Sequence, residues 1–302
     1  MKRTIITVLS LALALSVHAT LTTDYFEYGT NMTSLAGLTT ADTFGWGANN
    51  WSGSANPIYN VSTQSGGATP TPLKISLSFS ATGYVNNSDG GVLLGGLSAG
   101  AVTRSLAAAQ SNDLWVSMLI DSTFWGAGNA GNHGYFQVNG SGSDWLGLYS
   151  PLAIMAVVEN GVETNSSDLN PTDTQLIVAK MATDVSGAND ELTAWFVRNG
   201  VDLSGLDVAA LDAAARWKYQ TPVAQDIWGA SVSSVGLEIK SVRDPYDPSS
   251  GQNRYTYMDN LRVSYGGLTD DQHVMEVLTG VPEPAVGLAL VTIALAGLRR
   301  RA

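Results

Sequence analysis

Short runs in which apolar and polar residues alternate recur along this sequence. In residues 73–79 an apolar side chain stands at every second position, which is the period of a half-buried β-strand. Residues 114–120 are more continuously apolar, as expected of a central strand. Further runs with strand-forming composition are residues 135–138, 145–149, 176–181, 192–197, 232–239 and 255–263. Gly, Asn and Ser between these runs, as at 139–142 and 186–190, predict hairpin turns.

Helical periodicity is almost absent. Only residues 206–216, which are rich in Ala and Leu, favour a helix. Many short strands, turn signals throughout and little helix are typical of an antiparallel β-sandwich. No Pro-rich or charge-rich linker interrupts the middle of the chain. The sequence therefore predicts a single all-β sandwich domain over residues 20–265.

The composition excludes several classes of function. The 302 residues contain no cysteine, which excludes disulfides, thiolate metal sites and cysteine nucleophiles. Residues 20–284 hold ten Lys and Arg against all 26 Asp and Glu, a formal charge of −16. Such a body repels nucleic acid and anionic lipid surfaces, so neither is an expected partner.

The N-terminus has the three parts of a secretory signal peptide. Lys2 and Arg3 precede an apolar run over residues 5–15, and small residues end at Ala19. This order predicts export by the secretion machinery, with residues 1–19 removed by signal peptidase between Ala19 and Thr20.

The C-terminus is organised in a similar way. Val281, Pro282, Glu283 and Pro284 precede the apolar run 285–298, and the basic residues Arg299, Arg300 and Arg301 follow it. As a helix, the apolar run would be ~21 Å long, short of the ~30 Å hydrocarbon core of a bilayer. The arginines suit the cytoplasmic side of a membrane. We interpret residues 281–302 as a sorting signal with a short transmembrane helix and 266–280 as a spacer, so the precursor would carry apolar helices at both ends.

This three-part terminus resembles the PEP-CTERM sorting signal of Gram-negative bacteria. The resemblance implies a transient anchor in the inner membrane and processing near Pro284 by an exosortase-type membrane protease. It further implies release to the cell envelope, the cell surface or the extracellular matrix.

Four segments of the body resemble the concanavalin A-like or laminin-G-like jelly roll. They are residues 24–28, 114–117, 176–180 and 258–263. The resemblance implies a jelly-roll sandwich. Folds of this kind host many functions, so it does not define an activity.

Catalytic signatures are weak. Residues 96–100 match G-x-S-x-G, but they lie in a glycine-rich loop of a β-rich chain rather than between a strand and a helix. Glu159 and Glu163 flank an Asn-Gly turn and are expected at a solvated rim, and no clustered carboxylates of the glucanase type occur. A non-enzymatic protein is favoured. A polysaccharide hydrolase or lyase with carboxylates on separate strands is the alternative, and an inert structural module is the second alternative.

Tryptophans in polar loops are the best binding signal. Trp46, Trp51 and Trp125 lie among Gly, Asn and Ser, where an indole can stack on a sugar ring. The competing interpretation is packing in the core, as predicted for Trp115 and Trp195 on apolar strands. We predict weak carbohydrate binding through the loop tryptophans, with an exopolysaccharide as a candidate partner.

Two acidic residues interrupt the terminal strands. Glu27 follows the first apolar run and Asp259 lies within the last one. Terminal strands of jelly rolls commonly pair, so the two carboxylates could meet and hold a structural calcium ion through oxygen ligands. Alternatively both point outward by alternation. No other cofactor is predicted.

Overall fold

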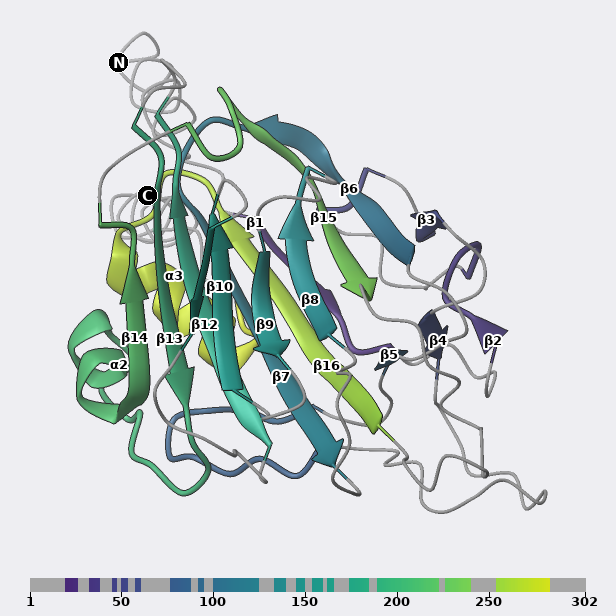
Figure 1. The fold of residues 1–302 in the computed structure, drawn as a ribbon. Coiled ribbons are helices and arrows are strands. Elements are labelled where there is room, and N and C mark those ends of the chain that lie inside the picture. The colour runs from purple at the N-terminus through teal and green to yellow at the C-terminus, as the bar shows by residue number, and fades with distance from the viewer. Residues whose placement is uncertain are drawn as a thin grey trace, which may run out of the picture.

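Two antiparallel β-sheets packed face to face form the body of the protein (Figure 1). The computed structural model describes residues 20–26, 33–38, 45–47, 50–53, 58–60, 77–87, 92–94, 100–124, 133–139, 145–149, 154–159, 162–165, 174–184, 189–222, 226–239 and 254–282. Within these ranges the named strands pair antiparallel, which confirms the predicted all-β sandwich.

The first sheet has the strand order β14-β13-β12-β7-β16-β5-β4-β2, and β1 pairs with β16 beside this path. Its strands are β1 (Thr20–Asp24), β2 (Thr33–Ser34), β4 (Ile58–Asn60), β5 (Val92–Leu94), β7 (Leu114–Phe124), β12 (Gln175–Ala182), β13 (Glu191–Val197), β14 (Ala215–Gln220) and β16 (Arg254–Tyr265). The first and last strands thus lie side by side, as expected for a jelly roll.

The second sheet has the order β11-β10-β9-β8-β15-β6-β3. Its strands are β3 (Ser52–Gly53), β6 (Gly100–Gln110), β8 (His133–Val138), β9 (Trp145–Tyr149), β10 (Ile154–Glu159), β11 (Val162–Asn165) and β15 (Val232–Ile239). The hairpins predicted from the turn residues at 139–142 and 186–190 are confirmed, because β8 pairs with β9 and β12 with β13.

Strand β7 shows why its sequence is continuously apolar. Val116, Met118 and Ile120 face the core between the sheets, whereas Trp115 and Leu119 face a second apolar cluster on the outer side of the first sheet. Both faces of this strand are therefore buried, which is the environment that selects an unbroken apolar run.

Two helices, among the described residues, cover part of that outer face: α2 (Val208–Ala214) and α3 (Asp270–Thr279), the latter drawn in yellow behind the sheets in Figure 1. Helix α2 confirms the helix predicted over 206–216. Leu77 and Phe79 pack on the same cluster. The predicted strand over 73–79 is wrong for residues 77–79, which form no strand although their apolar side chains are buried.

The prediction of a spacer over 266–280 is also wrong. Val274, Val277 and Leu278 of α3 are fully buried against the first sheet. Their spacing places them on one face of a helix, and a capping box at Thr269 starts that helix. The folded body therefore continues to Gly280.

Buried Arg262 on β16 holds the end of α3 in place. Its Nη1 donates hydrogen bonds to the carbonyl oxygens of Val277 (3.0 Å) and Leu278 (2.7 Å). Because the last carbonyls of a helix have no partner within it, a cation at this end both satisfies them and complements the helix dipole. Gly280 ends the helix at φ 71°, and a Cβ there would lie 2.9 Å from Tyr25 Oη.

The predicted signal peptide, including Ala19, and the sorting-signal residues from Glu283 to Arg301 lie outside the described residues. Val281 and Pro282 are described and exposed directly after α3. Neither α2 nor α3, the helices within the described ranges, is long and apolar enough to cross a membrane.

Candidate functional site

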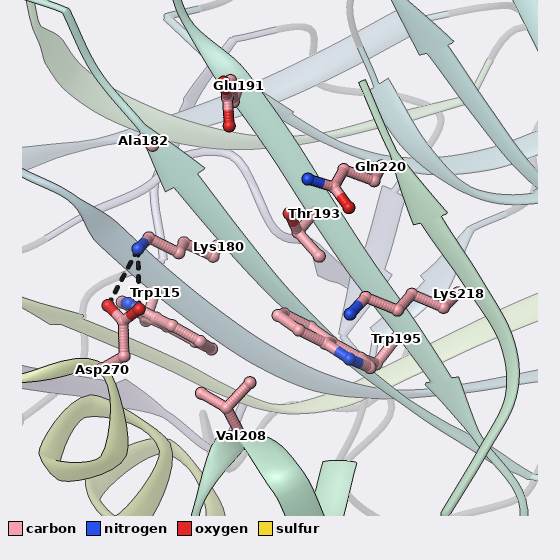
Figure 2. Close-up of a pocket in the computed structure, with 10 residues that line it drawn as sticks. All are labelled: Trp115, Lys180, Ala182, Glu191, Thr193, Trp195, Val208, Lys218, Gln220 and Asp270. Atoms are coloured by element: carbon pink, nitrogen blue, oxygen red, sulfur yellow. Dashed lines mark hydrogen bonds and ion pairs between the residues drawn. The ribbon is translucent and has the colours of Figure 1, made fainter. Parts of the chain in front are cut away.

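A pocket of about 230 Å³ opens on the outer face of the first sheet, next to the ends of both helices (Figure 2). Strands β7, β12, β13 and β14 form its floor. Its lining residues are Trp115, Lys180, Ala182, Glu191, Thr193, Trp195, Val208, Lys218, Gln220 and Asp270. The pocket thus combines indole rings with amide, hydroxyl and charged groups.

Backbone register brings four of these residues into one row across four strands. Trp115 lies opposite Lys180, Lys180 opposite Thr193, and Thr193 opposite Gln220. Glu191 precedes Thr193 by two residues, so it faces the same side of the sheet. The row therefore results from strand pairing between segments that are far apart in the sequence.

The indole of Trp115, at one end of the row, stacks on that of Trp195. The rings of Trp115 and Trp195 have centroids 5.5 Å apart and planes 10° apart. Lys180 Nζ lies 5.8 Å from the centroid of Trp115, and Lys218 Nζ lies 5.2 Å from that of Trp195. Both tryptophans are buried, as predicted, and the side chains of Lys180 and Lys218 lie over their rings. The indoles support the pocket rather than offering an open stacking platform.

The indole nitrogens differ in their surroundings. Trp195 Nε1 donates a 2.6 Å hydrogen bond to Asp212 Oδ1. Trp115 Nε1 is buried and has no hydrogen-bond acceptor among the described residues. A buried donor without a partner costs on the order of 1–3 kcal/mol of folding free energy, so this N–H group beneath the pocket destabilises the folded state.

Each lysine of the pocket is held by aspartates. Lys180 Nζ lies 2.9 Å from both carboxyl oxygens of Asp270 and 2.9 Å from Asp113 Oδ2. Burial opposes the charge on Lys180, but the hydrogen bonds to Asp270 and Asp113 outweigh it and raise the pKa of the lysine. Lys218 Nζ lies 2.6 Å from Asp212 Oδ1.

The same balance acts on Asp212. Burial alone would raise the pKa of this carboxyl, but the hydrogen bonds from Lys218 and Trp195 outweigh it and lower the pKa. Glu191 differs from the other carboxylates at the pocket, because this exposed residue makes no ion pair within the part of the chain that the structure describes.

The loop tryptophans predicted to stack on sugar are not available for it. Trp51 is fully buried and donates through Nε1 to Asp24 Oδ2 at 2.9 Å. Trp46 is 5% exposed, donates to Thr23 O at 3.1 Å and packs beneath the Arg104 guanidinium, 4.2 Å from its ring centroid. Both side chains lie in the core between the sheets, so both are packing residues. Trp125 lies outside the described residues.

Of the two proposed calcium ligands, the structure describes only Asp259. Asp259 is fully buried and accepts a hydrogen bond from the backbone N–H of Asn260 at 2.6 Å, so the alternative that it points outward is wrong. Glu27 lies outside the described residues. Within the described ranges no group of three or more potential metal-ligating side chains occurs.

Glu159 does not belong to a solvated rim. This carboxylate is 4% exposed and accepts hydrogen bonds from Tyr219 Oη (2.8 Å) and Thr221 Oγ1 (2.5 Å). Burial and the neighbouring Glu159 raise the pKa of Tyr219. Glu159 thus connects β10 of one sheet with β14 and the residue after it in the other, which is a structural role. Of the G-x-S-x-G match, only Gly100 lies within the described residues.

A serine, a histidine and a glutamate meet beneath α3 but form no catalytic site. Ser264 Oγ lies 2.7 Å from His273 Nδ1 and donates to Glu276 Oε2 at 2.5 Å. All three side chains are at most 1% exposed. A substrate therefore has no access to them, and the cluster anchors the helix to β16.

The residues that line the pocket on its polar side were not predicted from the sequence. Alternation in 191–195 indicates that Glu191 and Thr193 face away from the core, which is a signal for outward-facing polar residues. The order of the strands and the position of the helices decide that these residues border a pocket, and neither is visible in a local pattern.

No known protein family matches the sequence, and no curated protein matches it. Three of the solved structures that it is similar to are carbohydrate-related. The CBM2 module of the evolved Dit of Lactobacillus casei BL23 phage J-1 is 11% identical, with 84% of this chain and 92% of that one covered and a TM-score of 0.35.

The alginate lyase Aly36B, a mutant in complex with alginate trisaccharide, is 10% identical over 81% of this chain and 97% of that one, with a TM-score of 0.39. The carbohydrate recognition domain of Emp47p is 9% identical over 82% and 98%, also with a TM-score of 0.39. At these scores the likeness carries no argument about a ligand, and the sandwich assignment rests on the strand pairing described above.

Proposed function

We propose that this protein is exported to the cell surface or extracellular matrix and binds carbohydrate there without transforming it. The observation that carries the binding proposal is the pocket on the outer face of the first sheet. It presents the Thr193 hydroxyl, the Gln220 amide and the Glu191 carboxylate side by side. A site with few polar groups in fixed positions is typical of small-ligand binding.

These groups suit the chemistry of a sugar. A sugar hydroxyl both donates and accepts hydrogen bonds, as the Thr193 hydroxyl and the Gln220 amide also do between them, while Glu191 accepts. Ala182 and Val208 supply apolar contact at the rim. Hydroxyl groups and C–H faces of one sugar unit would therefore both find partners.

The pocket predicts weak binding. Its volume of about 230 Å³ is smaller than a drug-sized ligand site, so one or two sugar units fit at a time. Three hydrogen bonds, each contributing ~0.5–1.5 kcal/mol net, give about 1.5–4.5 kcal/mol, which corresponds to a Kd between roughly 1 and 100 mM. Retention on a polymer, where many sites compete for the same protein, is the suitable assay.

Two substitutions test the binding site. We expect Thr193→Val and Gln220→Ala each to weaken retention of the mature protein on an insoluble polysaccharide by about two- to tenfold, because each removes one hydrogen-bonding group. Affinity chromatography on a polysaccharide panel measures this. The matched controls are Thr103→Val and Gln110→Ala on β6 of the other sheet, which should leave retention unchanged.

Equal losses in the control variants, or retention that is insensitive to Thr193 and Gln220, would contradict the site. Release of reducing ends or unsaturated products by stringently purified protein would instead favour the hydrolase or lyase. Absence of retention on every polysaccharide would favour the inert structural module.

The ends of the folded body support the proposed export route. Within the described residues, strand β1 pairs with β16 from Thr20 to Asp24, which follow the proposed signal peptidase site. Helix α3 ends at Thr279, before Val281 and Pro282. Cleavage after Ala19 and processing near Pro284 by an exosortase-type protease would therefore remove no strand or helix of the described body.

A further inference from the structure

The pocket carries more negative than positive charge once its ion pairs are counted. Two ammonium groups, from Lys180 and Lys218, stand against the carboxylates of Glu191, Asp270, Asp113 and Asp212. A ligand entering here therefore meets a net negative site on a body that is itself strongly acidic.

Both lysines are already paired with aspartates, which weakens their attraction for an anionic ligand. An ammonium group has three N–H donors, and Lys180 Nζ lies 2.9 Å from each of three aspartate oxygens. Lys218 is engaged by Asp212 at 2.6 Å. These aspartates belong to the same folded chain, so a carboxylate from solution would have to displace partners that are already in position.

Glu191 is the group that remains. It is exposed, and its cross-strand partner on β12 is Ala182, which carries no charge. An ionised carboxylate is an acceptor only, so it suits the donor of a hydroxyl group and repels another carboxylate.

We propose that this pocket selects uncharged, hydroxyl-rich glycans and rejects polyuronates, with Glu191 as the residue that determines this specificity. The inference rests on the proposed carbohydrate binding and adds the class of ligand to it. Acidic polysaccharides are excluded by charge, whereas neutral ones lose nothing at the occupied lysines and gain an acceptor at Glu191.

The experiment compares polymers that differ only in charge. The mature protein is run by affinity electrophoresis through gels that contain alginate or polygalacturonate, and through gels that contain the same polymers after reduction of their carboxyl groups to alcohols. At low ionic strength we expect retardation by the reduced polymers to exceed that by the parent polyuronates about tenfold or more, since like charges repel most strongly without salt.

Glu191→Gln is the decisive variant. It should increase retardation by the parent polyuronates at least threefold. The ratio of retardation by the reduced polymers to retardation by the parent polyuronates should therefore decrease. Asp202→Asn makes the same change of charge at an exposed loop position beyond the opposite end of β13 from Glu191, keeps the acceptor for the Ser204 N–H, and should leave the ratio unchanged. An equal effect of both variants would show that net charge acts over the whole surface, and the role of Glu191 would be wrong.

Different results would contradict the proposed selectivity and the proposed carbohydrate binding. Stronger retardation by polyuronates than by their reduced forms would overturn the selectivity while leaving carbohydrate binding in place. No retardation by any polymer, with uncharged β-glucan and xylan included, would remove the proposed function and this inference together.

Discussion

Asp24 connects the first strand to the core between the sheets. Its Oδ2 accepts hydrogen bonds from Arg104 Nη1 (2.7 Å) and Trp51 Nε1 (2.9 Å), and its Oδ1 accepts from the backbone N–H of Phe26 (2.9 Å). The side chains of this ion pair are at most 1% exposed. A buried charge without its partner is strongly unfavourable, so each residue of the pair depends on the other.

We expect Asp24→Leu to lower the free energy of unfolding by about 3–5 kcal/mol, because it removes the buried carboxylate that lies 2.7 Å from the Arg104 guanidinium. Urea denaturation measures the change. Adding Arg104→Met should recover part of the loss, since two apolar side chains no longer need a polar partner. If the double variant is less stable than the sum of the single effects predicts, this account of the pair is wrong.

Helix α3 depends on a neutral histidine. His273 is buried, stacks on Trp115 at 6.3 Å between ring centroids, and bonds to Ser264. Burial lowers the pKa of His273 below its ordinary value, against the opposing attraction of Asp270 and Asp113. The unfolded chain therefore binds a proton at a higher pH than the folded protein does.

This difference fixes the direction of a pH effect. Stability is complete above the ordinary histidine pKa of about 6.5 and falls as the pH drops from there through the lower pKa of the folded state. We expect the urea midpoint to decrease between pH ~7 and ~5. A His273→Gln variant, although less stable, should show a flatter profile over this range. An unchanged slope in that variant would assign the pH dependence to other groups.

At the scale of the whole molecule, the two ends of the body meet in one sheet. β1 and β16 pair along five residues, and α3 then packs on the outer face of that sheet. The segments proposed to be removed thus lie before β1 and after α3. Processing can separate both from the body without breaking this pairing.

Mass spectrometry of the mature protein tests the processing. We expect an N-terminus at Thr20 and a C-terminus near Pro284, without Arg299–Arg301. In an Ala19→Phe control, signal peptidase should fail to cut, because it requires a small residue at that position, and the longer N-terminus should persist. A cytosolic protein that ends in Arg301 and Ala302 would contradict the export route.

Local patterns in the sequence predicted β7, β8, β9, β12, β13, β15 and β16, whereas β6, β10 and β14 were not predicted. Residues 114–120, 176–181 and 192–197 lie in strands, and helix α2 lies within 206–216, because side-chain periodicity and turn residues act within one segment. Trp115 and Trp195 were predictable as buried because apolar residues flank both of them directly in the sequence.

Only the tertiary structure decided what those segments contact. Trp46, Trp51 and Glu159 stand in polar or turn-like surroundings, yet long-range contacts bury all three. Residues 266–280 resemble a spacer in the sequence, but in the structure they contain α3, which packs on the first sheet. The pocket arises from the strand order, which places Trp115 and Gln220 in one row. Periodicity reports which side of a strand is apolar, whereas the neighbour that covers that side comes from elsewhere in the chain.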